Sequence, residues 1–215
     1  MFKILTTTAI ILCLATTAAS AEEALAGNTA IKFRGGIMHI TNSKGGAVLE
    51  SKLKGGMMGE VAFAHFVSNN FSVEGSLGYA RSKGSFKSTV AGWDVKNKKV
   101  SIVPVTILAQ YNIAADAFLN PYFGIGMTYQ LVSGKGTVKD SGGLNWNYKY
   151  KNGAGIVGQI GLDVMVSDNI GLNIDVKHVI KLNHDMAFTY PGLVTVNIKD
   201  RVSTTSILAG VVFTF

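Results

Sequence analysis

A period of two in the hydropathy of the chain constrains its fold more than any other feature. Successive side chains of a β-strand point to opposite faces, so this period predicts strands with one apolar and one polar face. In the last segment, Ile207, Ala209, Val211, Phe213 and Phe215 all have the same parity. The segments that alternate in this way are 29–41, 55–67, 70–81, 100–113, 121–132, 153–166, 170–181 and 203–215.

Charged residues indicate what each face of these strands meets. A lysine or arginine that faces lipid at the bilayer midplane costs about 2–4 kcal/mol, so a lipid-facing surface should be free of such residues. The charged residues that we assign to the polar face are Lys32, Arg34, Glu60, Glu74, Asp163, Asp175, Lys177 and Lys181. Their parity favours lipid on the apolar side and a polar interior on the other.

The connections between the segments alternate in length. Short links at 68–70, 114–120 and 167–169 alternate with long polar links near 42–54, 82–99, 133–152 and 182–202. Short turns on one side and long loops on the other are typical of outer-membrane barrels. The predicted fold is therefore all-β: an eight-stranded antiparallel up-and-down transmembrane β-barrel. The alternative is a soluble lipocalin-type barrel with the apolar face inside, which would require an unusually apolar and aromatic lining.

The N-terminal residues predict export. Lys3, an apolar run and the small residues Ala19-Ser20-Ala21 form the layout of a secretory signal peptide, 1–21, which we expect to be cleaved to leave residues 22–215 as the barrel domain. Cys13, the only cysteine, would leave with it. We therefore expect no disulfide, no metal site and no cofactor, and a location in the bacterial outer membrane.

Several motifs in the second half carry a family resemblance. They are "VPVTILAQYNI" (103–113), "NPYFGIGMTYQL" (120–131), "GAGIVGQIGLDVMVSDNIGLNIDVKHV" (153–179) and the terminal aromatic strand. With these the chain resembles the OmpW family of small outer-membrane barrels. The resemblance implies a narrow, largely hydrophobic channel near the outer end that passes small apolar molecules and releases them sideways through the wall.

Eight strands enclose a lumen just wide enough to be filled by side chains or to hold one small ligand. The charges inside would form either an ion-pair network that plugs the barrel or a charged conduction path, and we expect Glu60 and Glu74 to pair with Lys32 and Arg34. Pro104 lacks a ladder donor and is a candidate point for lateral opening. Apolar residues with inward parity would line a channel or simply fill the barrel: Met38, Met58, Pro104, Leu108, Val157 and Val179.

The long links contain more lysine and arginine than aspartate and glutamate. This excess predicts contact with the phosphates of lipopolysaccharide, with Lys87, Lys96, Lys98 and Lys99 as candidates. Trp93, Trp146 and the other aromatics of "NWNYKY" would lie at the headgroup boundary. Phe213 and Phe215 resemble the terminal signal that the bacterial barrel-assembly machinery reads. We expect a monomer in contact with outer-membrane lipid, with no nucleic-acid partner.

Catalysis is the least favoured function. His39 and His184 could meet, whereas His65 and His178 lie toward opposite ends of their strands, and no serine or carboxylate with recognisable spacing accompanies any of them. The predicted function is a narrow channel for small hydrophobic molecules. A non-conducting anchor, adhesin or surface antigen that displays its loops remains the alternative, because it needs only the barrel.

Overall fold

A computed structural model of the chain describes residues 27–42, 50–88, 93–115, 117–139, 143, 145–190 and 194–215. Within these ranges no helix is long and apolar enough to cross a membrane. The strands are β1 (Thr29–Asn42), β2 (Glu50–Lys54), β3 (Gly56–Phe66), β4 (Phe71–Ser88), β5 (Trp93–Asn112), β6 (Leu119–Ser133), β7 (Lys135–Lys139), β8 (Asn145–Tyr150), β9 (Gly153–Met165), β10 (Ile170–Tyr190) and β11 (Val194–Thr214). The predicted signal peptide lies outside the described residues.

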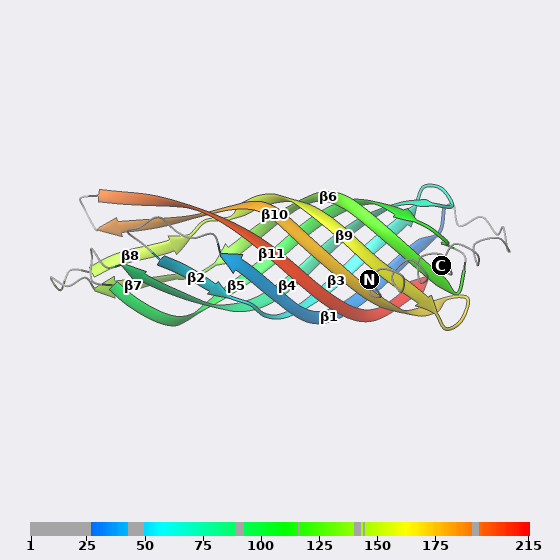
Figure 1. The fold of residues 1–215 in the computed structure, drawn as a ribbon, viewed down its shortest axis with the longest axis horizontal. Helices are drawn as coiled ribbons and strands as arrows, with labels where there is room; N and C mark the ends of the chain where they lie inside the picture. Colours follow the sequence, from blue (N-terminus) through cyan, green and yellow to red (C-terminus); the bar gives the residue numbers. More distant parts are fainter. Residues whose placement is uncertain are drawn as a thin grey trace, which may run out of the picture.

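The sheet closes on itself because its last strand pairs with its first. β11 is antiparallel to both β10 and β1, with a register that runs from Ala30 opposite Thr214 to Asn42 opposite Val202. The amide of Thr29 also donates to the carbonyl of Phe215 at 2.8 Å. The predicted eight-stranded antiparallel barrel is confirmed, and closure leaves the transmembrane wall without an edge (Figure 1).

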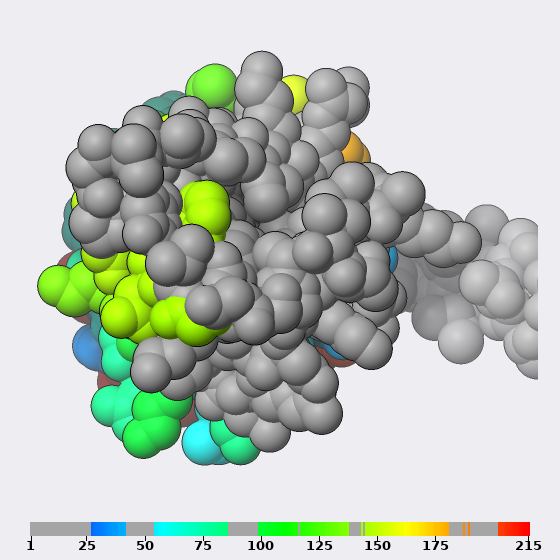
Figure 2. Space-filling model, turned by 90° about the vertical axis from the view of Figure 1, so that its left-hand side faces the viewer, coloured from blue at the N-terminus to red at the C-terminus, as the bar shows by residue number. Residues whose placement is uncertain are grey.

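The two ends of the barrel differ. The short connections β3–β4 (67–70), β5–β6 (described at 113–115 and 117–118) and β9–β10 (166–169) lie at one end, together with the C-terminus; we call this the turn end (right in Figure 1). At the other, extended end, the strands continue well beyond the predicted segments, and β7 and β8 form a hairpin on β10. Figure 2 looks onto the extended end, where residues of this hairpin (yellow-green) form part of the rim.

The long polar links were therefore predicted incorrectly as loops. β4 runs on to Ser88, β5 starts at Trp93, and β10 and β11 pair up to Tyr190 and Val194. Beyond the lipid the outer face of each strand contacts water instead, so exposed polar residues such as Lys83 and Lys99 replace the outer apolar residues while backbone pairing continues. The period-two signal marks only the part of each strand that faces lipid.

The apolar parity lies on the outside. Ile125 and Met127 on β6 are 66% and 67% exposed, and the rings of Phe71, Tyr111 and Phe123 form a row across β4, β5 and β6 near the turn end. Arg81, at the end of the third predicted segment, also has this parity. It lies exposed toward the extended end, where its Nε donates to Tyr79 Oη at 3.1 Å. The apolar band therefore ends near Tyr79 on β4, and the lipocalin-type arrangement is excluded.

Candidate functional site in the barrel interior

Arg34 is the centre of an ionic cluster inside the barrel. Its guanidinium lies 2.7 Å from Glu74 Oε2, 3.0 Å from Asp175 Oδ2 and 3.4 Å from Glu60 Oε1. The four side chains are 0–1% exposed and come from β1, β3, β4 and β10. Contacts between strands that do not neighbour one another show that the side chains meet across the lumen.

A second cation completes the cluster. Lys177 Nζ lies 2.8 Å from Glu60 Oε1 and 3.2 Å from Glu74 Oε1, and it also donates to Ser76 Oγ. Both glutamates thus bridge the two cations. An isolated buried charge is costly, whereas paired and hydrogen-bonded charges are tolerated, so each member of this cluster depends on the others.

Neutral side chains fill the remaining space around the carboxylates. Gln110 donates to Glu74 at 3.0 Å and to Gln159 at 2.8 Å, while Gln159 donates to Asp175 at 2.6 Å. We call Arg34, Glu60, Glu74, Gln110, Gln159, Asp175 and Lys177 together the ion plug. Because these side chains bond one another across the lumen, they occupy its cross-section at this level.

Lys32 has a different partner from the one that strand adjacency predicts. Its Nζ binds Asp163 on β9 at 2.9 Å and lies 4.2 Å from the centre of the Tyr122 ring. Glu60 and Glu74 instead serve Arg34 and Lys177. In an eight-stranded barrel, long side chains reach across the lumen, so adjacency along the sheet does not determine which charges pair. The side chain of Lys181 lies outside the described residues.

Apolar residues pack between the ion plug and the extended end. Met38, Met58, Leu208 and Ile102 belong to a buried cluster that Tyr148 and Tyr150 of β8 complete; we call it the outer apolar cluster. Leu108, Val157 and Val179 form a smaller buried group, and Pro104 is also buried. Trp146 packs against the outer apolar cluster rather than at the headgroup boundary, because the alternation of β8 turns its even-numbered residues inward.

The wall beside this cluster has a discontinuity. The β4–β5 ladder pairs Leu77 with Val105 and Ala80 with Ile102, but Gly78 and Tyr79 do not pair with the residues opposite them, Pro104 and Val103. Proline has no amide hydrogen to donate. The register is unchanged on both sides of the gap, so the interruption is local.

The interior and exterior surfaces approach each other at this gap. A Cβ at Gly78 would lie only 2.6 Å from Met58 Cε and 2.9 Å from Pro104 Cγ, so both side chains lie against the glycine backbone from inside. On the outside lies a groove of about 620 Å³, lined mainly by Phe33, Gly59, Val61, Leu77, Tyr79 and Val103. Only backbone separates Met58 from that groove.

Exposed lysines form a row just beyond the apolar band. Lys54 on β2 is opposite Lys83 on β4, which is opposite Lys99 on β5, and all three side chains are exposed. Like charges directly opposite each other destabilise a sheet. Of the four predicted lysines, only Lys99 has a described side chain; those of Lys87, Lys96 and Lys98 lie outside the described residues.

The remaining candidate residues face outward. His65 contacts Thr29 at 3.4 Å and His178 contacts Thr205 at 2.9 Å, His39 is exposed, and the His184 side chain is not described. Phe215 is 62% exposed, and Phe213 packs edge-on against Phe33 with ring centres 6.2 Å apart.

Among the described side chains, no group of three or more His, Cys, Asp or Glu could hold a metal ion.

A closed barrel with an apolar outer face and buried ion pairs defines an integral β-barrel protein of the bacterial outer membrane. A family model described as the OmpW family matches residues 24–215, and the chain belongs to this family. The turn end is therefore the periplasmic end and the extended end faces outward. The barrel lies among outer-membrane lipid and lipopolysaccharide, and proteins of this family are structural or transport proteins.

Individual relatives agree with this placement. A Rickettsia bellii protein named as an outer membrane protein is 34% identical over 58% of this chain and 51% of its own length. A Rickettsia conorii protein with the same kind of name is 32% identical over 75% of this chain and 67% of its own length. The chain thus spans about half to two thirds of these relatives. The crystal structure of the outer membrane protein OprG from Pseudomonas aeruginosa shares the fold, with a TM-score of 0.70 and 16% identity. The match covers 88% of this chain and 96% of OprG.

Sequence reasoning identified the charged members of the ion plug but not its neutral ones. Gln110 and Gln159 have inward parity in predicted strands, so their parity could have indicated an interior role. Lys54 and Lys83 fell in links that were predicted to be loops, which hid their alignment with Lys99. The register of an extended hairpin was the missing information.

Proposed function

We propose that the protein admits small hydrophobic molecules at the extended end and releases them sideways into the membrane between β4 and β5. The observation that carries this proposal is the interrupted ladder at Gly78 and Tyr79. It lies between the outer apolar cluster, inside the barrel, and the groove on the outside of the wall. The ion plug supports a sideways exit because it fills the direct route to the periplasmic end.

Methionines suit the route that a solute would take. Met38 and Met58 are unbranched and adapt their shape easily, so a rotamer change can make room for an apolar guest. Met58 also lies against Gly78, directly inside the gap. A solute would thus pass from one deformable apolar surface to another. It would not contact the ion plug, whose charges it could not solvate.

The first test uses the two strand prolines. Pro104→Val restores a backbone donor at the gap, whereas Pro121→Val changes a proline near the turn end as a matched control. One hydrogen bond of about 1 kcal/mol corresponds to roughly a fivefold change in an equilibrium. We expect Pro104→Val to slow uptake of a fluorescent apolar probe about fivefold and Pro121→Val to leave it unchanged. Equal uptake by both variants would contradict the proposal.

The ion plug equally favours a second function, a non-conducting anchor that displays its outer residues as an adhesin or antigen. The two functions differ in uptake and attachment. If the anchor is the function, cells with and without the protein take up the probe equally, and shortening the β7–β8 hairpin abolishes attachment. If transport is the function, the protein raises uptake and the shortened hairpin leaves attachment unchanged.

We also propose that the lysine row binds phosphate groups of lipopolysaccharide. Bound phosphates would relieve the repulsion among Lys54, Lys83 and Lys99, and Arg81 lies on the same face closer to the apolar band. Lys87, Lys96 and Lys98 remain predictions for the same role. Changing the row to glutamine should reduce the lipopolysaccharide that co-purifies, whereas changing it to arginine should retain it. If the glutamine and arginine variants retained equal amounts of lipopolysaccharide, this proposal would be contradicted.

We propose that Phe213 and Phe215 are recognised by the barrel-assembly machinery after cleavage of residues 1–21. We further propose that the barrel acts as a monomer without a cofactor, a catalytic activity or a nucleic-acid partner. Closure of the sheet supports a monomer, since the transmembrane wall has no edge to cover.

A further inference from the structure

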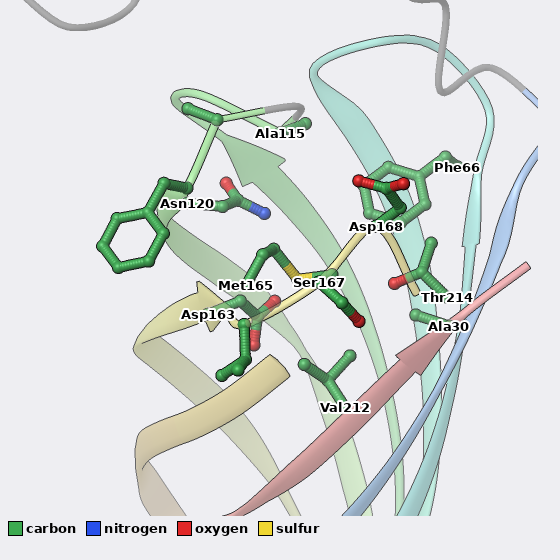
Figure 3. Close-up of a pocket in the computed structure, with 13 residues that line it drawn as sticks. Ala30, Phe66, Ala115, Asn120, Asp163, Met165, Ser167, Asp168, Val212 and Thr214 are labelled. Carbon is green, nitrogen blue, oxygen red and sulfur yellow. The ribbon is translucent and has the colours of Figure 1, made fainter. Parts of the chain in front are cut away.

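A separate cavity of about 440 Å³ opens at the turn end (Figure 3). Its lining comes from β1, the ends of β3, β9 and β11, the start of β6, the turn before β6 and the turn after β9. The volume falls within the range of small-molecule sites. The ion plug lies between this cavity and the outer apolar cluster, so the transport proposal makes no use of it.

Asn120 supplies an unsatisfied acceptor to the cavity. The residue is 3% exposed, and its Nδ2 donates to Asn112 Oδ1 at 3.2 Å. Its Oδ1 is buried and accepts no hydrogen bond from any described residue. Buried polar atoms are almost always paired, so an unpaired acceptor in the lining of a cavity indicates a missing donor.

The charged groups that line the cavity are carboxylates. Asp163 is buried and already accepts from Lys32 Nζ at 2.9 Å and from Asn173 Nδ2 at 2.6 Å. Asp168 is exposed in the turn after β9. Among the described residues that line the cavity there is no lysine, arginine or histidine. Because Lys32 neutralises Asp163, Asp168 is the uncompensated charge among these lining residues, and it favours a cationic ligand over an anionic one.

The walls of the cavity are apolar. Phe66, Phe118, Met165 and Val212 line it together with alanines of β1 and of the β5–β6 turn, and Figure 3 shows Phe66, Met165 and Val212 around the polar groups. Such a surface suits an aliphatic chain rather than a second charged group. The required ligand thus combines a donor-only head with a short hydrocarbon body.

We propose that this cavity binds small aliphatic amines in their protonated form. An ammonium group has three donors and no acceptor. A rotation of the Asn120 amide would present Oδ1, which is buried in this structure, and the ammonium would then donate to it. The ammonium would also offset the charge of Asp168, while its chain would pack against Phe66, Met165 and Val212. An alcohol of the same length offers one donor without charge, and a carboxylate offers none, so both should bind more weakly.

The test compares pentylamine with 1-pentanol and pentanoate. Each is titrated into the refolded barrel in lipid nanodiscs while the methyl resonance of Met165 is recorded. Met127, which is 67% exposed on the lipid-facing side, reports partition into the bilayer in the same sample. We expect a saturable shift at Met165 but not at Met127, with pentylamine binding about tenfold more tightly than the alcohol.

Two variants test the assigned contacts. Asn120→Ala should weaken pentylamine binding about tenfold. Asp168→Asn should weaken it about two- to fivefold, because the charge of an exposed carboxylate is screened by water. Asn147→Ala, at the extended end, should leave binding unchanged. Asp168 is exposed, so its variant does not depend on the packing that Asn120 supports. Equal shifts at Met165 and Met127, equal affinity for amine and alcohol, or unchanged binding by Asp168→Asn would overturn the proposal.

Discussion

Arg34 Nη2 lies 2.7 Å from Glu74 Oε2, although β1 and β4 do not pair in the sheet. The two side chains meet across the lumen and are completely buried. This contact joins strands that backbone hydrogen bonds leave separate. We therefore expect the ion plug to stabilise the barrel as a cross-brace and to close its direct path at the same time.

Loss of Arg34 should destabilise the barrel strongly. Arg34→Met leaves Asp175 without its cation and Glu60 and Glu74 with only Lys177, and breaking a buried charge pair costs about 3–5 kcal/mol. Urea unfolding in lipid vesicles, followed by gel mobility, measures the change. Arg81→Met, at an exposed position, is the control and should change the unfolding midpoint little. Equal effects of the two variants would contradict a stabilising ion plug.

Two glycines of the β6–β9 ladder should respond differently to alanine. A Cβ at Gly126 would lie 1.9 Å from the carbonyl oxygen of Ile107, whereas a Cβ at Gly158 would meet open space. Overpacking costs about 1–3 kcal/mol, so Gly126→Ala should lower the free energy of unfolding by about that amount. Gly158→Ala should be neutral in the same assay. The reverse order would show that the inward face has room at Gly126.

Planar bilayer recordings should separate a plugged lumen from an open one. Refolded residues 22–215 should give no discrete current steps, because the ion plug fills the lumen. A charge-balanced variant in which Arg34, Glu60, Glu74 and Lys177 all become alanine should give small steps. Heat-dependent gel migration confirms that both proteins are folded. Steps in the unmodified protein would show an open axial path, and a change of those steps in Leu108→Arg would then locate the path beside Val157.

The end of β11 should matter for assembly. Phe213 packs edge-on against Phe33, and the amide of Phe215 donates to the carbonyl of Thr29 at 2.9 Å. An aromatic pair contributes about 0.5–1.5 kcal/mol beyond its buried area. Removing Phe215 and changing Phe213 to alanine should slow insertion into vesicles, as measured by the folded fraction over time. Phe123→Ala changes an aromatic residue on β6, far from the end of the chain. This variant should insert at the normal rate if insertion depends on aromatic residues at the C-terminus.

Much of the barrel could be predicted from the sequence because lipid imposes a strict rule. Each strand must alternate where it crosses the bilayer, so the eight crossings, their faces and the closure of β11 on β1 follow from parity. Beyond Tyr79 on β4 that constraint ends. The extended hairpins, and with them the alignment of Lys54, Lys83 and Lys99, could not be recovered from hydropathy.

The interior was predictable as a list of residues but not as an arrangement. Parity places Lys32, Arg34 and Asp163 inside, yet the pairing of Lys32 with Asp163 depends on side-chain reach across a narrow lumen. Likewise Pro104 was identifiable as a strand position without a backbone donor. Its alignment with the unpaired Gly78 required the register of β4 on β5.

A reversible cross-link across the β4–β5 gap tests the sideways route most directly. Tyr79→Cys with Val103→Cys joins the two strands at the gap, while Gly75→Cys with Ile107→Cys joins the same strands where they are paired. We predict that oxidation abolishes uptake of the apolar probe only in the first pair and that a reductant restores it. Unchanged uptake in the oxidised first pair would show that solutes do not leave between β4 and β5.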